Sequence, residues 1–138
     1  MEKYYMNEAL KLAKKAFDED EIPVGAIVVK NGEIIGCGYN QKEKSNNPLK
    51  HAEMIAIEEA CKYIGDWRLN DCVIYVTLEP CLMCLGAIVE TRIEKVVYGA
   101  KKFDQMFDIK NDIDIVGGVL EKECLSILQE FFKNKRNK

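Results

Sequence analysis

The chain has 138 residues, of which 48% are hydrophobic and 31% are charged, with a formal net charge of −3 and a sequence pI near 5.3. This length is typical of a single domain, which we expect over residues 1–138, and the acidic balance argues against a protein that binds long nucleic acid backbones by charge alone. No run approaches the ~20 apolar residues of a membrane span and the start lacks the apolar stretch of a signal peptide, so we expect a cytoplasmic protein.

The first half of the chain predicts a helix, a β-hairpin and a second helix. Apolar residues recur at helical spacing over residues 6–17. Two β-rich runs, VGAIVV and IIGCGY, are joined across Asn31-Gly32, a dipeptide typical of tight hairpin turns. The polar run KEKSNNPLK then predicts a loop, and helical spacing returns over residues 51–65.

The second half predicts two further strands, a weak third strand and two helices. The strands are CVIYVT, KVVYGA and the weak IDIV, which follows the polar stretch KKFDQMFDIKND. Glu79-Pro80 is expected to open and cap a helix whose first turn holds Cys81 and Cys84, and a last helix is expected over residues 121–132. The order of elements fits a three-layer α/β/α domain around a mixed sheet.

One histidine and two cysteines form the most informative constellation in the sequence. His51 opens one predicted helix, while Cys81 and Cys84, three residues apart, lie on one face of another. Two thiolates and an imidazole suit zinc. Structural zinc sites usually close with four protein ligands, whereas three ligands leave a position for water. The spacing therefore indicates an open, catalytic metal site.

Glu53 stands two residues after His51, at the start of the same predicted helix. A carboxylate there can point toward the open position of the metal. It can accept a proton from an activated water and deliver that proton to the substrate. The combination predicts a hydrolytic enzyme.

Three other interpretations of the cysteines remain open from the residues alone. CLMC is also compatible with a redox pair, with a closed structural zinc site, or with unrelated core cysteines. A cytoplasmic protein keeps its cysteines reduced. The four cysteines outside the motif each lie in or beside an apolar run, and we expect them to be buried and inert: Cys37, Cys61, Cys72 and Cys124.

The motif HAE followed by TLEPCLMC resembles the signature of the zinc-dependent cytidine and deoxycytidylate deaminase superfamily. Further runs are similar, in order, to the bacterial tRNA adenosine deaminases: IPVGAIVVKNGEIIGCGYN, DWRL, IYVTLEPC, RIEKVVYGA and GVLEKECLSILQEFF. The resemblance implies a cytidine-deaminase-like α/β/α fold with a central mixed five-stranded sheet. It also implies a homodimer and one zinc ion per subunit, held by His51, Cys81 and Cys84. Glu53 would be the general acid/base, Asn40 would read the base, and Val24 would form part of the pocket wall.

The implied reaction is hydrolytic deamination of adenosine to inosine in tRNA, at the unpaired wobble position of the anticodon loop. The alternative is a deaminase of a free nucleobase or nucleoside such as guanine, adenine or cytosine. This alternative is favoured by the connection after Ala100, which starts with Lys101 and Lys102 and is shorter than in the tRNA-acting family. A third hypothesis is a non-catalytic subunit or RNA-binding module that keeps the zinc for structure, against which the presence of Glu53 argues. The basic tail KNKRNK is typical of a solvated helix end and is also compatible with contact to nucleic acid.

Overall fold

The structure, a computed structural model, describes residues 1–102 and 113–136. Its helices are α1 (Glu2–Asp18), α2 (Lys42–Ser45), α3 (Ala52–Ile64), α4 (Leu82–Glu90) and α5 (Glu121–Arg136). Its strands are β1 (Gly25–Lys30), β2 (Glu33–Tyr39), β3 (Cys72–Leu78), β4 (Lys95–Ala100) and β5 (Asp114–Val116). The strands form a five-stranded sheet in the order β2-β1-β3-β4-β5.

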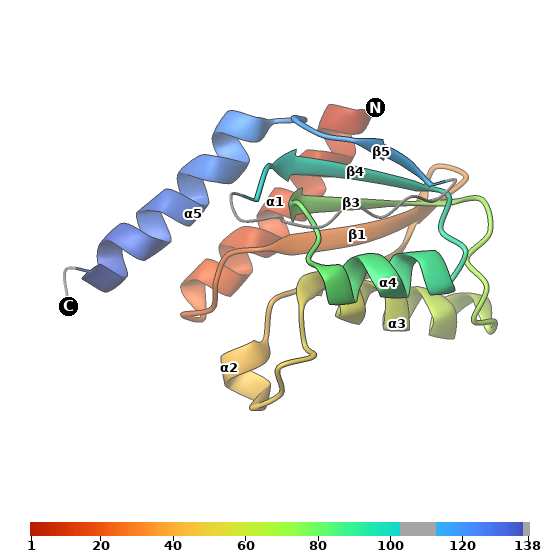
Figure 1. Cartoon of the computed structure of the whole chain (residues 1–138), viewed down its shortest axis with the longest axis horizontal. Helices are drawn as coiled ribbons and strands as arrows, with labels where there is room; N and C mark the ends of the chain where they lie inside the picture. Colours follow the sequence, from red (N-terminus) through yellow and green to blue (C-terminus); the bar gives the residue numbers. More distant parts are fainter. Residues whose placement is uncertain (103–112, 137–138) are drawn as a thin grey trace.

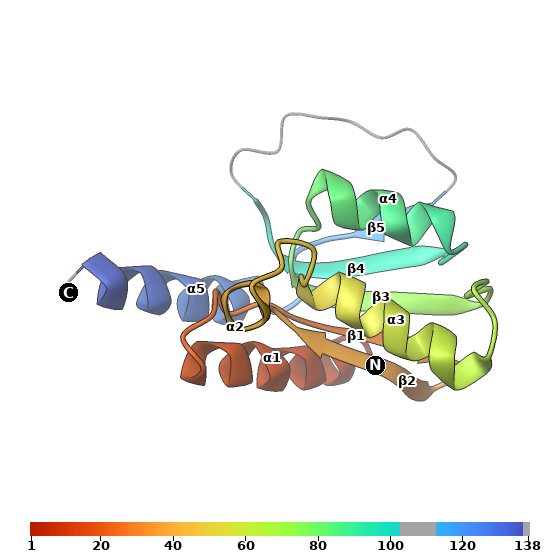
Figure 2. The same ribbon diagram turned by 90° about the horizontal axis from the view of Figure 1, so that it is seen from below.

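Helices cover both faces of this sheet. α1 and α5 lie on one face, and α3 and α4 lie side by side on the other (Figures 1 and 2). β1 is antiparallel to β2 and β3, whereas β4 is parallel to both β3 and β5. Parallel neighbours require a crossover, which α4 supplies between β3 and β4. The mixed sheet between two helical layers confirms the predicted fold class.

The β1–β2 hairpin turns at the dipeptide that the sequence indicated. Asn31 has φ 50° and Gly32 has φ 79°, both in the left-handed region. A type I′ turn requires positive φ at both central residues, and asparagine followed by glycine meets that requirement with little strain. The predicted hairpin is therefore confirmed, with Lys30 and Glu33 paired across the turn.

Small residues bring α3 close to β2. Ala52, Ala56 and Ala60 recur every fourth position on α3 and are fully buried. They lie against Gly36 and Gly38 of β2, where an added Cβ would meet the α3 backbone. This close contact fixes the position of α3, and with it the residues at the start of that helix.

Replacing Gly36 by alanine should destabilise the protein by roughly 3 kcal/mol, because overpacking of a tight contact forces the backbone to shift. The new Cβ would overlap the carbonyl oxygen of Ala56 and lie 2.9 Å from the backbone nitrogen of Ala60. Chemical denaturation of the two proteins measures the difference. Glu33→Ala, at the exposed end of the same strand, should change stability by no more than about 0.5 kcal/mol. Equal stability of Gly36→Ala and the parent would contradict this tight contact between α3 and β2.

The start of α4 differs from the sequence-based expectation. Pro80 does not open the helix: Cys81 has φ −74° and ψ 174°, an extended conformation, and the helix begins at Leu82. Glu79 does not cap the helix either, since its carboxylate accepts the backbone N–H of Lys102 at 3.0 Å. The Glu79 carboxylate thus binds a residue that is distant in sequence and does not cap α4.

Two other elements differ in extent. The loop predicted over KEKSNNPLK contains the short helix α2. The last helix, expected to end at Phe132, continues to Arg136 with basic side chains in its final turn, where cations interact favourably with the helix dipole.

In the described part of the chain no helix combines the length and hydropathy that a membrane crossing needs. Most of the connection KKFDQMFDIKND and the last two residues of the tail lie outside the described residues.

Candidate active site

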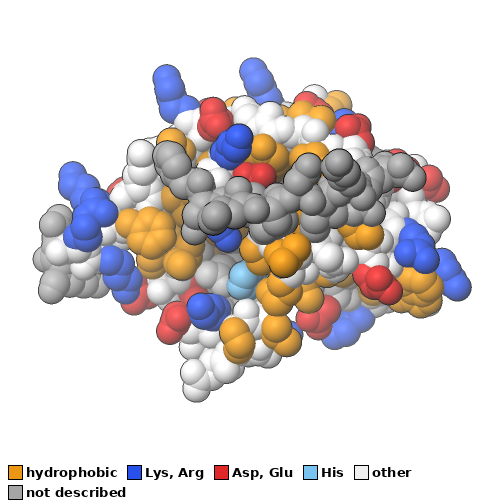
Figure 3. Space-filling model, in the orientation of Figure 1, with side chains coloured by type: hydrophobic (Ala, Val, Ile, Leu, Met, Phe, Trp, Pro, Cys, Tyr) orange, Lys and Arg blue, Asp and Glu red, His pale blue; other side chains and the backbone are white. Residues whose placement is uncertain are grey.

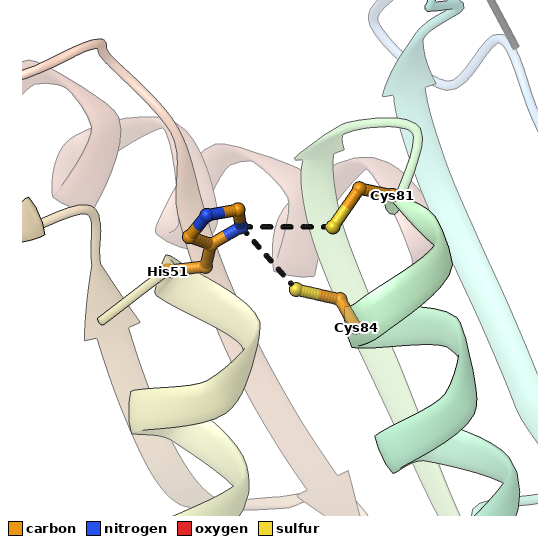
Figure 4. Close-up of side chains that lie close together, drawn as sticks. All are labelled: His51, Cys81 and Cys84. Atoms are coloured by element: carbon orange, nitrogen blue, oxygen red, sulfur yellow. Dashed lines mark hydrogen bonds between the residues drawn. The ribbon is translucent and has the colours of Figure 1, made fainter. Parts of the chain in front are cut away.

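Three side chains with metal-binding atoms meet where α3 and α4 begin. His51 directly precedes α3, Cys81 directly precedes α4, and Cys84 lies in the first turn of α4. Figure 4 shows His51 facing both sulfur atoms from the neighbouring helix. Its Nδ1 lies 3.7 Å from Sγ of Cys81 and 3.5 Å from Sγ of Cys84. The three atoms lie within 4.8 Å of one another.

This geometry fits a tetrahedral zinc ion. With Zn–S near 2.3 Å and Zn–N near 2.0 Å, a tetrahedral ion separates a ligand nitrogen from a ligand sulfur by about 3.5 Å. The two observed nitrogen–sulfur distances, 3.5 and 3.7 Å, match that spacing. Among the described residues, the group that could hold a metal contains only these three side chains. The residues present therefore fit zinc with one position left for water.

The two thiols have opposite pKa shifts. Hydrogen bonds from the Cys84 thiol and from His51 lower the pKa of Cys81 to about 3. The same hydrogen bond to Cys81, together with burial, raises the pKa of Cys84. The pKa of His51 is raised, chiefly by its hydrogen bond with Cys81. One thiolate is thus stabilised by a shared proton, and a divalent cation between both sulfurs would replace that proton with a stronger positive charge.

Glu53 is a buried acid beside this cluster. Its side chain is 4% exposed. Burial disfavours the charged carboxylate and raises the pKa of Glu53 to about 7. A group that gains and loses a proton near neutral pH is suited to general acid–base chemistry. It lines the same cavity as His51 and Cys81.

The cavity has a volume of about 680 Å³, within the range of small-molecule sites. Asn40 and Val24, the two substrate-contact candidates, both line it. Both residues are 8% exposed. The imidazole of His51, the one histidine of the chain, is visible at the surface in Figure 3 with basic and apolar side chains around it. The structure thus brings all six candidate residues to one place.

Helix α5 forms a cavity wall that sequence reasoning missed. Leu125, Leu128 and Phe132 line the cavity, and Arg136 lies at the same wall one turn further on. Their spacing predicts an apolar helix face, but no local pattern indicates which distant element that face contacts. Three lysines also line the cavity: Lys42, Lys101 and Lys102.

The four other cysteines lie outside the metal cluster. Cys72 and Cys124 are buried as expected, whereas Cys37 and Cys61 are only half-buried. Desolvation raises the pKa of all four thiols. All six cysteines of the chain are free of disulfides. The four thiols are therefore weak nucleophiles at neutral pH.

Comparison with known proteins identifies the family of the chain. The model of the cytidine and deoxycytidylate deaminase zinc-binding region matches residues 1–100. The chain belongs to this deaminase family. It is accordingly a zinc-dependent hydrolytic deaminase, as the resemblance implied.

This deaminase is similar to proteins with two different named substrates. It is 46% identical to the tRNA-specific adenosine deaminase of Bacillus subtilis, over 97% of this chain and 90% of the relative. A solved structure from a study of A-to-I editing by tRNA:A34 deaminases at the wobble position of transfer RNA has a TM-score of 0.85 and 34% identity. That match covers 91% of this chain and 99% of the other. A guanine deaminase from Bacillus subtilis has a TM-score of 0.68 and 43% identity, over 71% of this chain and 63% of its own.

Proposed function

We propose that the protein converts adenosine to inosine in tRNA, at the wobble position of the anticodon, by hydrolytic deamination. The observation that carries this proposal is the match to a tRNA-specific adenosine deaminase over 97% of this chain and 90% of the relative. The unpaired anticodon loop offers a base that can be moved into a pocket at small unstacking cost. We further propose that one domain, residues 1–138, performs the reaction.

His51, Cys81 and Cys84 would hold the zinc ion, whose chemistry is to lower the pKa of a bound water toward about 7. Glu53 would accept a proton from the attacking water. It would deliver this proton to the ring nitrogen N1, and would then pass the second proton of the added water from the new C6 hydroxyl to the departing amine, so that ammonia leaves and inosine remains. The burial and raised pKa of Glu53 support this role.

Asn40 and Val24 would contact the base. The carboxamide of Asn40 carries both a donor and an acceptor, which suits the polar edge of a purine. Val24 would offer an apolar contact to the ring. Both line the cavity that contains Glu53, and this shared position supports the assignment.

Basic side chains at the cavity would contact the RNA backbone. Lys42, Lys101, Lys102 and Arg136 all line it, although the net charge of the chain is −3. Positive charge is thus concentrated near the site of an acidic protein. Phosphate contacts of this kind weaken as salt concentration rises.

Deamination of a free nucleobase is the second candidate. The 43% identity with a guanine deaminase favours it. The alignment with the tRNA-specific relative spans 147 residues, more than the 138 of this chain, so that relative has residues that this chain lacks. We propose that part of this difference lies in the connection after Ala100, where a shorter segment would reduce contact with RNA.

Ammonia release by the zinc-loaded protein separates the two candidates. The substrates are an anticodon stem-loop with an unpaired wobble adenosine, the same stem-loop with guanosine there, and free guanine, adenine, cytosine and their nucleosides. The proposal predicts release from the adenosine stem-loop and little from the free compounds. Release from one of the free bases or nucleosides, with none from the stem-loop, would establish the second candidate instead.

We propose that the working unit is a homodimer built on α4. This helix reads LMCLGAIVE, with one charged residue, yet Leu82 is 55% exposed and Gly86 is exposed. An apolar exposed helix face is typical of an interface.

We also propose a cytoplasmic location. The cysteines are all free of disulfides, which is consistent with a reducing compartment.

Gly86→Arg should convert this dimer to a folded monomer. Apart from the chain neighbours of Gly86 and the nearby backbone of its own helix, no described atom lies within 4 Å of a Cβ at this position, so a single chain has room for the longer side chain. Light scattering after gel filtration measures the molar mass, and circular dichroism checks the fold. A parent chain that elutes as a monomer, or a variant that stays dimeric, would contradict the interface.

A further inference from the structure

Glu21 is a buried carboxylate that the chemistry proposed above does not use. Its side chain is 1% exposed. The backbone N–H of Glu43 donates to its Oε1 at 3.0 Å, and the backbone N–H of Lys44 donates to its Oε2 at 2.6 Å. Among the described residues no cation forms an ion pair with it. A carboxylate removed from water depends on such charge-assisted hydrogen bonds, so this contact with α2 is strongly favoured.

Helix α2 has few other attachments. It has four residues and none of them is buried, so hydrophobic packing cannot hold it in place. Lys44 pairs with Glu19 at 3.0 Å, but the lysine side chain is 56% exposed. Exposed ion pairs contribute little to stability. The Gln41 N–H also donates to the carbonyl oxygen of Lys50 at 2.9 Å, just before the helix. Glu21 is therefore the main buried attachment of α2.

The two segments that Glu21 joins both line the active-site cavity. Ile22 and Val24 follow Glu21, while Lys42 is the first residue of α2 and Asn40 lies just before that helix. The Asn40 side chain bridges these segments: its Nδ2 donates to the carbonyl oxygen of Ile22 at 3.4 Å, and its Oδ1 accepts the Lys42 N–H at 3.3 Å. The Asn40 backbone N–H donates to the carbonyl oxygen of Val24 at 3.1 Å. The orientation of the carboxamide thus depends on the spacing between the two segments.

We infer that Glu21 is a positioning residue, which holds α2 against residues 22–24 and thereby orients the carboxamide of Asn40 in the cavity. The inference rests on the proposed function, because that function gives Asn40 its role toward the base. His51, Glu53 and the two cysteine ligands are positioned by α3 and α4 instead. Loss of the Glu21 contacts should therefore weaken substrate binding and leave the metal site intact.

Glu21→Gln tests this inference because it keeps the size of the side chain and removes the charge and one acceptor. We expect KM for the stem-loop to rise about tenfold, with kcat changed less than about threefold and zinc content unchanged. Glu33→Gln makes the same chemical change at the exposed far end of β2, where the carboxylate accepts the Tyr63 hydroxyl at 3.0 Å. That control should keep the KM of the parent.

A double-mutant cycle separates positioning from a general structural role. In an Asn40→Ala background, Glu21→Gln should raise KM by less than about twofold, because the effect acts through a group that is already absent. An equal rise in both backgrounds would overturn the inference. So would a loss of zinc in Glu21→Gln that accounts for the lost activity. If Glu21→Gln failed to fold, Glu21→Asp, which keeps the charge and lacks one methylene group, would enter the same cycle.

The side-chain amide signal of Asn40 gives a readout that does not depend on activity. In protein labelled with ¹⁵N asparagine, this signal is assigned by its loss in Asn40→Ala. It should shift in Glu21→Gln and stay in place in Glu33→Gln, and an unmoved signal in Glu21→Gln would overturn the inference. A parent protein inactive on the stem-loop would count against the proposed function, while this spectrum would still decide the role of Glu21.

Discussion

Glu53→Gln will lower kcat by at least about 1,000-fold and will leave zinc content and thermal stability unchanged. General acid–base groups contribute typically 10²- to 10⁴-fold to rate, and Glu53 would serve both the attacking water and the leaving amine. Glutamine has the same shape but cannot carry the proton. The side chain is 4% exposed, so a neutral isostere also avoids the cost of burying charge, and stability should not fall. Single-turnover deamination of the stem-loop gives the rate, and elemental analysis gives the zinc content.

Glu58→Gln is the matched control for Glu53→Gln. Glu58 lies on the same helix, with a side chain that is 55% exposed and pairs with Lys50 at 3.4 Å. Its replacement should leave kcat within about twofold of the parent, as is typical of surface changes away from the site. If Glu53→Gln kept most of its turnover, the role of Glu53 in proton transfer would be wrong.

Cys84→Ser will remove zinc from the protein and, with it, deaminase activity. A serine hydroxyl remains protonated at neutral pH and replaces a thiolate poorly as a zinc ligand. Cys84 is fully buried, and its Sγ lies 3.5 Å from Nδ1 of His51, inside the cluster of ligand atoms. We expect one zinc per chain in the parent and only a small fraction of that in the variant after gel filtration. Added zinc should raise the melting temperature of the parent alone, because a ligand that binds the folded state stabilises it.

Cys61→Ser separates this effect from a general response to loss of a thiol. Cys61 lies on α3 outside the cluster of ligand atoms, with a weak hydrogen bond from its Sγ to the carbonyl oxygen of Trp67 at 3.8 Å. The Cys61→Ser variant should keep both zinc and activity. Full zinc content in Cys84→Ser would contradict the proposed ligand set.

Local patterns predicted the parts of the site that depend on local structure. The positions of His51 and Cys81 at helix starts could be predicted because helical apolar spacing begins just after each of them. Cysteines three residues apart also share a helix face, which brings Cys81 and Cys84 together. The Asn31-Gly32 turn likewise follows from the backbone preferences of two residues.

Contacts between distant segments could not be predicted in the same way. Glu79 was expected to cap α4, but its carboxylate accepts an N–H from Lys102, which the β4 strand brings to it. The wall formed by α5, and the contact of Glu21 with α2, also depend on how separate elements pack. A sequence pattern shows which face of an element is apolar, or which residue is charged, but not what lies opposite.

The proposed function requires that inosine forms in tRNA. The decisive measurement is nucleoside analysis of the anticodon stem-loop after incubation with the zinc-loaded protein, with Glu53→Gln as the inactive reference. We predict that the wobble adenosine is converted to inosine, with one ammonia released per inosine and adenosines elsewhere in the stem unchanged. A stem-loop recovered without inosine, by a protein that carries zinc and deaminates free guanine, would contradict the tRNA assignment.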